Sequence, residues 1–419
     1  MTYWFNSPGL RNLAPLGNTT GMKGLSSSFL VPKLFVGVNS IPERGGGVLR
    51  YVSPYCSQKR AFVVSDKHVM NLATRVSTSL QNTEFSTTIW GHTEPEVPLE
   101  NVEACAEAMR EYEPDLIVAV GGGSVMDLAK AAWILYERPD ITDLKTLTPT
   151  TPLGLRKKAL LLAVPTTSGT GSECTNAAVL SDPDEHRKVP IANRELVPDF
   201  AALDPNFTIG MPPGLTAGTG LDVLAHAMDD VLSPASNDIT DALALRAIEL
   251  VFKYLPKAYK NPRDREARLR MIMASSIAGM AFGNASAGLT HSLGHAIGKI
   301  FNIHHGLIVG VFIPYIIQFD AFVTDKYLDI CKALEINSCS NEEKLKALVN
   351  RVRELFGKLD VPLNLKDLGI TRQQLDDNMD KLVVDAIEDP DTFGSPRWIT
   401  EEQCKNLYLY AFDGKDIDF

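Results

Sequence analysis

The sequence predicts two domains of different class, an α/β domain over residues 29–204 and an all-helical domain over residues 205–419. Two observations support this prediction. Between residues 60 and 165, short apolar runs alternate with segments of helical periodicity, which is typical of parallel strands joined by helices. After residue 205 the segments of helical spacing follow one another, and strand candidates nearly vanish. With 419 residues, the chain is long enough for two hydrophobic cores.

The elements of the first domain follow in order along the chain. Strands are predicted at residues 60–66, 85–91, 115–120 and 159–165, and the run at 115–120 is near-continuously apolar. Helical spacing predicts helices at residues 67–80, 99–112 and 124–136. Residues 177–182 and 188–193 are predicted to form an antiparallel pair joined by a polar turn.

In the second domain, helical spacing is clearest at residues 239–255, 265–285 and 342–359. At the other end of the chain, residues 1–28 are rich in Gly, Ser, Asn and Pro and show no periodicity. We assign them to an N-terminal extension. A flexible arm and a segment that packs along a partner subunit are both open for this extension.

The composition excludes several classes of protein. A net charge of −10 argues against a nucleic-acid-binding surface, which would show a basic stripe. No apolar run reaches the roughly 18–20 residues that span a bilayer, and the N-terminus lacks the pattern of a signal peptide. The six cysteines are scattered without a CxxC pair, so we expect reduced thiols and a cytoplasmic protein.

A glycine run stands where the third strand meets the following helix. Residues 115–120 lead directly into Gly121, Gly122, Gly123 and Ser124. Glycines at such a turn let the backbone approach a phosphate, while the helix N-terminus presents free N–H groups. Ser124 and Asp127 also have the spacing of a capping box. The run predicts diphosphate binding, with a plain tight turn as the alternative; it is not the GxGxxG fingerprint.

Two further segments point to a nucleotide. Asp66 ends the first strand, where a carboxylate would accept hydrogen bonds from an adenosine ribose and repel a 2′-phosphate. Capping of the next helix is an equal alternative for Asp66. Residues 165–173 (PTTSGTGSE) follow the fourth strand and are dense in hydroxyls and glycine, which suits a loop that lines a nucleotide. An ordinary polar loop is the alternative for that segment.

Histidines are concentrated in the second domain. Residues 288–306 hold four of the eight histidines, and His291 and His295 stand four apart, on one face of a helix. Asp222 and His226 repeat that spacing earlier in the chain. Facing helices with such pairs would gather a carboxylate and several imidazoles around a divalent metal such as Fe²⁺ or Zn²⁺. Core or surface histidines are the alternative.

The acidic pair that follows these residues, Asp229 and Asp230, is expected to be solvated at a helix end.

Taken together and in this order, the motifs resemble the iron-dependent (group III) alcohol dehydrogenase family from about residue 29 to residue 411. The motifs are VVSD, GGGSVMDLAK, PTTSGTGSE, KVPI, LDP, GMPPGLTAGTGLDVLAHA and HSLGHAIGKIFNIHHG. The resemblance implies a dehydroquinate synthase-like fold, with a nucleotide-binding α/β domain and a helical metal-binding domain. The glycine loop alone is also found in glycerol dehydrogenases and dehydroquinate synthases.

The resemblance also implies roles for individual residues. The implied metal ligands are Asp222, His226, His291 and His305. His295 is implied to lie near the substrate and the nicotinamide without binding the metal. His304 is implied to be an outer neighbour of the metal ligands or incidental. The implied cofactor-binding residues are Asp66, Gly122, Gly123, Ser124, Thr166, Thr167, Thr170 and Lys188. Ala177 and Phe282 are implied to line the substrate pocket.

The resulting prediction is an NAD-dependent alcohol dehydrogenase or aldehyde reductase, in which a metal acts as Lewis acid during hydride transfer. The metal is expected to be Fe²⁺, with Zn²⁺ as the alternative, and NAD is expected to be preferred to NADP. His295 is the candidate for proton transfer. The partners are a small primary alcohol or its aldehyde and, by resemblance, further copies in a dimer or larger homo-oligomer. A lyase or cyclase on the same fold and a non-catalytic nucleotide-binding scaffold are the alternatives.

Overall fold

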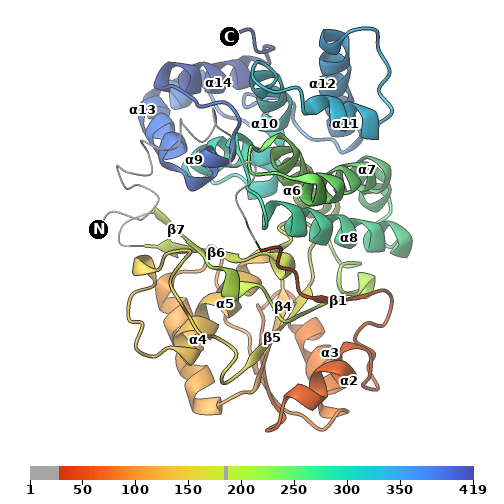
Figure 1. The fold of residues 1–419 in the computed structure, drawn as a ribbon, viewed down its shortest axis with the longest axis vertical. Coiled ribbons are helices and arrows are strands. Elements are labelled where there is room, and N and C mark those ends of the chain that lie inside the picture. Colours follow the sequence, from red (N-terminus) through yellow and green to blue (C-terminus); the bar gives the residue numbers. More distant parts are fainter. Residues whose placement is uncertain (1–27, 184–186) are drawn as a thin grey trace. The chain divides into compact units, whose positions relative to one another are not determined.

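The computed structural model describes residues 28–183 and 187–419 (Figure 1). Apart from Ser28, the predicted N-terminal extension lies outside them. The chain divides into two compact units. The sheet unit comprises Phe29–Met211 and Arg263–Gly279; the helical unit comprises Pro212–Pro262 and Met280–Phe419.

The sheet unit is built on six parallel strands, in the order β1-β8-β5-β4-β2-β3. Their bounds are β1 Lys33–Val36, β2 Arg60–Val64, β3 Ser86–Trp90, β4 Leu116–Gly121, β5 Leu160–Pro165 and β8 Phe200–Leu203. The predicted parallel sheet is therefore confirmed. Strands β1 and β8 were not predicted, because four residues are too few to show a periodicity.

A separate antiparallel pair, β6 (Ala177–Asp182) and β7 (Arg187–Ala192), confirms the predicted hairpin.

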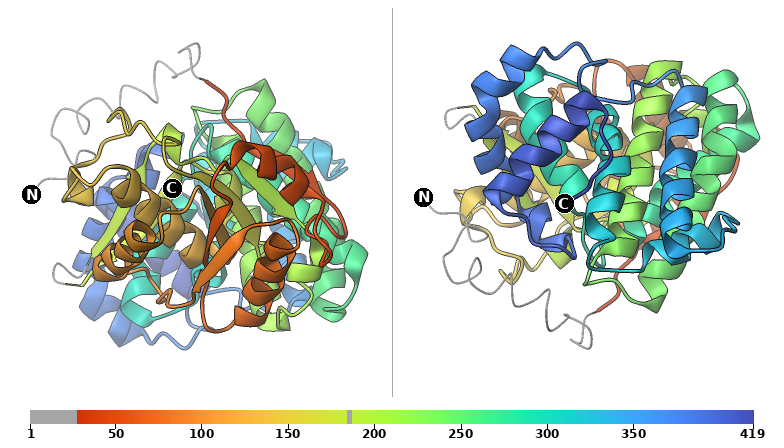
Figure 2. Two further views of the ribbon diagram at one scale, coloured as in Figure 1. Left: turned by 90° about the horizontal axis from the view of Figure 1, so that it is seen from below. Right: turned by 90° about the horizontal axis from the view of Figure 1, so that it is seen from above.

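Helices cover both faces of the six-stranded sheet. Their bounds are α2 Val48–Val52, α3 Met70–Gln81, α4 Leu99–Tyr112 and α5 Gly123–Glu137. Alternate residues of β2, β4, β5 and β8 form one core with α2 and α3. Helices α4 and α5 pack against each other and against β2, β3, β4 and β5. The left view in Figure 2 shows α2 and α3 (red to orange) on one side of the strands and α4 and α5 (yellow-brown) on the other.

The helical unit is all-helical over its described residues, as predicted. Its helices, green to blue in the right view of Figure 2, are α6 Pro213–Leu232, α7 Asp238–Lys260, α9 Leu289–Phe301, α10 His305–Asp320, α11 Tyr327–Ala333, α12 Asn341–Lys358, α13 Arg372–Glu388 and α14 Glu401–Asp413. Capping boxes begin four of them, at Asn237, Ser340, Thr371 and Thr400. Of the helices in the described part of the chain, none combines the length and the apolar character that crossing a membrane requires.

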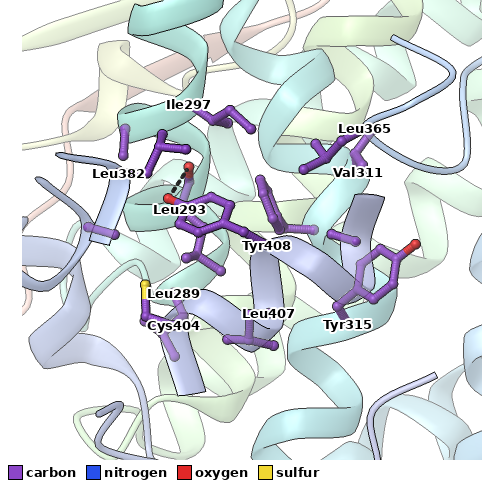
Figure 3. Packing of buried hydrophobic residues seen from close by; sticks show 14 of the residues in the cluster. Leu289, Leu293, Ile297, Val311, Tyr315, Leu365, Leu382, Cys404, Leu407 and Tyr408 are labelled. Atoms are coloured by element: carbon purple, nitrogen blue, oxygen red, sulfur yellow. Dashed lines mark hydrogen bonds between the residues drawn. The ribbon is translucent and has the colours of Figure 1, made fainter. Parts of the chain in front are cut away.

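One core of this unit fixes helix α9, which carries two of the histidines. Leu289, Leu293 and Ile297 lie on one face of α9 and pack among apolar residues of α10, α13 and α14 (Figure 3). The buried hydroxyl of Tyr408 donates to the Leu293 carbonyl at 3.1 Å. The opposite face of α9 is thereby directed away from this core, and it is the face that presents His291 and His295.

Helix α8 (Arg265–Phe282) belongs to both units, because its residues up to Gly279 group with the sheet unit. There, Ser275 Oγ accepts a hydrogen bond from the Gly171 N–H at 3.2 Å, and Ser276 Oγ donates to Glu173 Oε1 at 2.6 Å. Helix α8 follows α6 and α7 in the chain, but through these two serines it supports the hydroxyl-rich loop after β5.

Candidate functional site

The four predicted metal-ligand side chains meet in the helical unit. Asp222 and His226 stand one turn apart on α6, His291 lies in the first turn of α9, and His305 opens α10. Asp222 Oδ1 is 3.3 Å from His305 Nε2, 3.8 Å from His291 Nε2 and 3.8 Å from His226 Nδ1. One carboxylate oxygen therefore faces three imidazole nitrogens.

The chemistry of these atoms fits a divalent cation. Asp222, His226 and His291 are buried, and Asp222 Oδ1, His226 Nδ1 and His291 Nε2 have no hydrogen-bond partner among the described residues. Leaving such atoms unpaired in the interior is costly. Two ligand atoms that are each about 2.1 Å from one ion, at a tetrahedral angle, lie about 3.4 Å apart. The observed 3.3–3.8 Å spacing is close to that value.

The three side chains Asp222, His291 and His305 form the tightest set, with ligand atoms all within 4.8 Å of one another. His226 lies beside this set. Its ring stacks on Phe282 (centroids 4.1 Å apart, 7° between planes) and on His291 (4.3 Å, 26°). Phe282, predicted to line the substrate pocket, thus forms one wall of the histidine cluster. The roles of all four side chains as metal ligands stay predictions.

Glycines allow α10 to begin against α6. A Cβ on Gly306 would lie 2.3 Å from the Gly218 carbonyl oxygen and 2.9 Å from Asp222 Cβ. Only glycine at this position lets the backbone come so close, and the approach brings the neighbouring His305 to Asp222. His304 is exposed, and its ring lies against Gly218.

Burial and neighbouring charges act in opposite directions on these groups. Burial is the larger single influence on His226 and lowers its pKa to about 3. Burial also disfavours the charged form of His291, but the nearby Asp222 carboxylate and the hydrogen bond to Asp229 raise its pKa to about 10. Without a cation, a proton on His291 balances the buried carboxylates, and a bound cation would replace that proton.

The expectation for Asp229 and Asp230 was wrong, because both side chains are buried. The pair does lie in the last turn of α6, which ends at Leu232, but this end of the helix is buried rather than solvated. Asp229 Oδ2 accepts from His291 Nδ1 at 2.9 Å and from the Gly288 N–H at 2.8 Å. Its spacing of seven from Asp222, two helical turns, was the signal in the sequence for a shared face.

His295 is paired with an acid that the sequence did not indicate. Its Nδ1 lies 2.9 Å from Asp389 Oδ2 and 3.8 Å from Asp391 Oδ2. Its ring stacks on His305, with centroids 5.1 Å apart, and its side chain is 28% exposed. Asp389 also caps a short 3₁₀ helix, η7 (Pro390–Gly394). No local pattern links these residues, since 94 positions separate them.

In the sheet unit, the two predicted nucleotide loops lie side by side. Strands β4 and β5 end together, with Gly121 opposite Pro165, and the Thr166 N–H donates to the Gly121 carbonyl at 2.9 Å. A Cβ on Gly122 would meet the Thr167 side chain at 3.2 Å, and one on Gly123 would meet Thr170 Cγ2 at 2.8 Å.

Helix α5 begins at Gly123, and Ser124 in its first turn is exposed. The predicted capping box of Ser124 and Asp127 does not form, because Gly122 is the N-cap. Asp127 instead accepts from Ser172 Oγ at 3.0 Å and from the Val179 N–H at 3.1 Å.

Sequence reasoning missed Lys130, whose side chain is fully buried. Its ammonium group donates to Ser172 Oγ (3.0 Å), Thr175 O (3.0 Å) and Ala177 O (2.8 Å). Burial lowers the pKa of Lys130 to about 8, against the opposing effect of Asp127. Lys130 ties the hydroxyl-rich loop to α5, and it also holds the carbonyl of Ala177, a predicted pocket residue.

Asp66 and Lys188 have protein partners of their own. Asp66 Oδ1 accepts from the N–H groups of His68 (2.7 Å) and Val69 (3.3 Å), so Asp66 holds the turn that leads into α3, whose N-cap is Val69. Both bonds use Oδ1, so a ribose contact would need Oδ2. Lys188 lies on β7 and forms an ion pair with Glu96.

Comparisons with known proteins agree with the resemblance. Residues 43–205 match the family model described as iron-containing alcohol dehydrogenase, and residues 216–412 match that of the C-terminal part of the Fe-containing alcohol dehydrogenase family. An NADPH-dependent butanol dehydrogenase of Clostridium saccharobutylicum is 39% identical over 327 residues, covering 78% of this chain and 84% of that protein.

Two further matches differ in coverage. An aldehyde-alcohol dehydrogenase of Streptococcus pneumoniae is 35% identical over 394 residues, 87% of this chain, which spans 44% of that protein's length. The solved structure of an iron-containing alcohol dehydrogenase from Thermococcus thioreducens has a TM-score of 0.82 at 29% identity. That match covers 93% of this chain and 100% of the other.

Proposed function

The chain belongs to the iron-containing alcohol dehydrogenase family, and we propose that it interconverts a small primary alcohol and its aldehyde with NAD(H) at a metal held by Asp222, His226, His291 and His305. The observation that carries the proposal is the buried Asp222 Oδ1, which faces three imidazole nitrogens and has no hydrogen-bond partner among the described residues. A bound Fe²⁺ or Zn²⁺ supplies Lewis acidity, which favours the alkoxide over the alcohol and polarises the aldehyde carbonyl.

The chain's own residues supply the remaining parts. Asp222 would contribute the negative charge that retains a divalent cation, and the Phe282 ring covers one face of the His226 imidazole. The imidazole-rich set suits Zn²⁺ as well as Fe²⁺, so the metal loaded in the cell depends on availability.

His295 is the proposed proton carrier. The Asp389 carboxylate accepts from Nδ1, which leaves Nε2 to take the proton of the alcohol or to return it to an aldehyde. The side chain is 28% exposed, so its proton can exchange with water. Direct contact with solvent distinguishes it from His291, which is buried.

The nucleotide is proposed to bind at the adjoining loops of the sheet unit. Gly122, Gly123 and Ser124 offer backbone N–H groups at the start of α5 to the diphosphate. Thr166, Thr167 and Thr170 follow β5 and offer hydroxyls beside the same glycines. Lys188 is proposed to exchange its Glu96 partner for the cofactor, and Ala177 and Phe282 to line the substrate pocket.

NAD is the proposed preference over NADP. The support is Asp66, whose carboxylate would repel a 2′-phosphate. The butanol dehydrogenase named above is NADPH-dependent, which points the other way for that relative. Because these two indications disagree, the ratio of activity with NAD to activity with NADP has to be measured on this chain.

The test combines metal analysis with turnover. Protein purified without oxygen and loaded with Fe²⁺ is assayed with a panel of primary alcohols and aldehydes, recording NADH and NADPH separately. We expect one metal per chain and reduction of NAD⁺ by at least one short primary alcohol. Full activity of metal-free protein would contradict the proposal. Nucleotide binding without metal or turnover would favour a scaffold, and turnover of a phosphate-bearing substrate without net oxidation would favour a lyase.

A further inference from the structure

We propose that Asp229 is a positioning residue of the metal centre, which fixes the ring orientation and tautomer of His291 and thereby raises the affinity for the cation. The inference rests on the proposed function, since it assumes that His291 is a ligand. Asp229 itself does not face the other ligand atoms; it acts through His291.

The geometry joins two opposite atoms of one ring. His291 Nδ1 donates to Asp229 Oδ2 at 2.9 Å, while Nε2 points to Asp222, 3.8 Å from its Oδ1. A carboxylate only accepts, so the proton of a neutral His291 lies on Nδ1. The lone pair of Nε2 is then directed at the position of the cation, which is the arrangement that a ligating histidine requires.

Asp229 is itself held in place from several sides. It is 3% exposed, and the same Oδ2 accepts from the Gly288 N–H at 2.8 Å and from the Thr290 hydroxyl. Gly288 is the N-cap of α9, so these bonds attach the start of that helix to α6. Because Asp222 lies two turns earlier on the same helix, α6 presents both a ligand and the residue that orients the next ligand.

Charge matters here as well as geometry. In Asp229→Asn, the amide oxygen would still accept one or two of these bonds, but the negative charge that strengthens the basicity of His291 would be lost. If the amide NH₂ faced Nδ1 instead, the proton would move to Nε2 and block coordination. Loss of such an outer partner typically weakens metal binding about 10- to 100-fold.

The neighbouring residue provides a matched control. Asp230 is also buried on α6, but neither of its oxygens has a hydrogen-bond partner among the described residues. The charged groups near it are Asp241, Lys326 and Asp229, and His291 is not among them. Asp230→Asn therefore makes the same chemical change one position away without touching the histidine.

The experiment measures metal affinity rather than turnover. Full-length apoprotein of the wild type, Asp229→Asn and Asp230→Asn is titrated with Zn²⁺ in competition with a chromophoric chelator, and the melting temperature of each apoprotein is recorded. We expect a 10- to 100-fold higher Kd for Asp229→Asn and a change of less than twofold for Asp230→Asn.

Three outcomes would contradict either the proposed function or the role of Asp229. A wild type that binds no Zn²⁺ or Fe²⁺ would remove the proposed function itself. A wild type that binds normally, together with an unchanged Kd in Asp229→Asn, would overturn only the present inference and leave Asp229 as an anchor for α9. An equal loss in Asp230→Asn would show that general damage to α6, not the histidine contact, weakens binding.

A measurement on the wild type keeps the inference falsifiable if Asp229→Asn does not fold. In Zn²⁺-loaded protein with ¹⁵N-labelled histidine, the ring signals of His291 are assigned by their loss in His291→Gln. We expect a protonated Nδ1 and a coordinated Nε2. A protonated Nε2, or coordination through Nδ1, would overturn the proposal, and a purely structural role for Asp229 would not dictate either result.

Discussion

His295 and Asp389 form a hydrogen-bonded pair, with Nδ1 and Oδ2 at 2.9 Å, although 94 residues separate them in the chain. Asp389 sits between α13 and η7, and His295 lies on α9. Burial alone would raise the pKa of Asp389, but the adjacent His295 holds it below its usual value. An ionised Asp389 holds the imidazole ring in one orientation beside the histidine cluster.

From this pair we predict a loss of rate without a loss of metal. His295→Ala should retain one metal per chain while kcat falls about 10²- to 10⁴-fold, the usual contribution of a general acid or base. Asp389→Asn should cost less, about tenfold, because the imidazole remains but its orientation loosens. Metal analysis and steady-state kinetics are the readouts, with exposed His92→Ala as control. Metal loss in His295→Ala would make His295 a ligand.

Removal of one proposed metal ligand should abolish metal binding and leave nucleotide binding intact. His291→Ala should abolish bound metal and lower turnover by at least 10³-fold, since it also leaves Asp222 buried without its partner. NADH binding, measured by fluorescence, should stay within about twofold of the wild type, because the proposed nucleotide residues are in the sheet unit. A variant that keeps its metal would show that the other three side chains suffice.

Asp66→Gly should shift the cofactor preference towards NADP. Two anions a few ångströms apart repel by on the order of 1–4 kcal/mol at effective dielectric constants between water and a protein surface. That range corresponds to a change of about five-fold to several-hundred-fold in the ratio of kcat/KM for the two cofactors. Asp66 also accepts hydrogen bonds in the turn before α3, so Asp66→Asn, which keeps an acceptor but loses the charge, should shift the ratio in the same direction without removing those bonds. An unchanged ratio in both variants would leave Asp66 with its role in the turn alone.

Asp230→Asn should stabilise the fold, and more so at higher pH. Burial, with Asp241 nearby, raises the pKa of Asp230 well above its usual value, although Lys326 opposes this. An acid whose pKa is higher in the folded state costs stability as the pH rises from about 4 towards that folded pKa. Asn carries no such cost, so its melting temperature should exceed that of the wild type by a margin that widens from pH 5 to pH 8. A constant or shrinking margin would contradict the assignment.

Much of the fold was determined by patterns that are local in the sequence. Apolar runs located β2, β4 and β5, and helical spacing located α4 at its observed bounds. The glycine run marked the close approach of the backbone between β4 and α5, where Gly122 and Gly123 leave room for the side chains of Thr167 and Thr170. The spacing of Asp222 and His226 placed both on one helical face. These features depend on residues that are close together in the chain and on the chemistry of their side chains, both of which can be read from the sequence.

The tertiary structure alone decided which distant groups meet. Asp389 lies beside His295, and Ser275 and Ser276 of α8 contact the loop after β5. Asp229, which was expected to face solvent, is instead the hydrogen-bond partner of His291. Lys130 likewise gained its partners only through the folding of that loop onto α5. Such contacts arise from the packing of whole elements, whose register is set by many weak apolar contacts at once. No short stretch of sequence contains all of these contacts. The residues that hydrogen-bond to the site histidines can therefore be identified only in the folded chain.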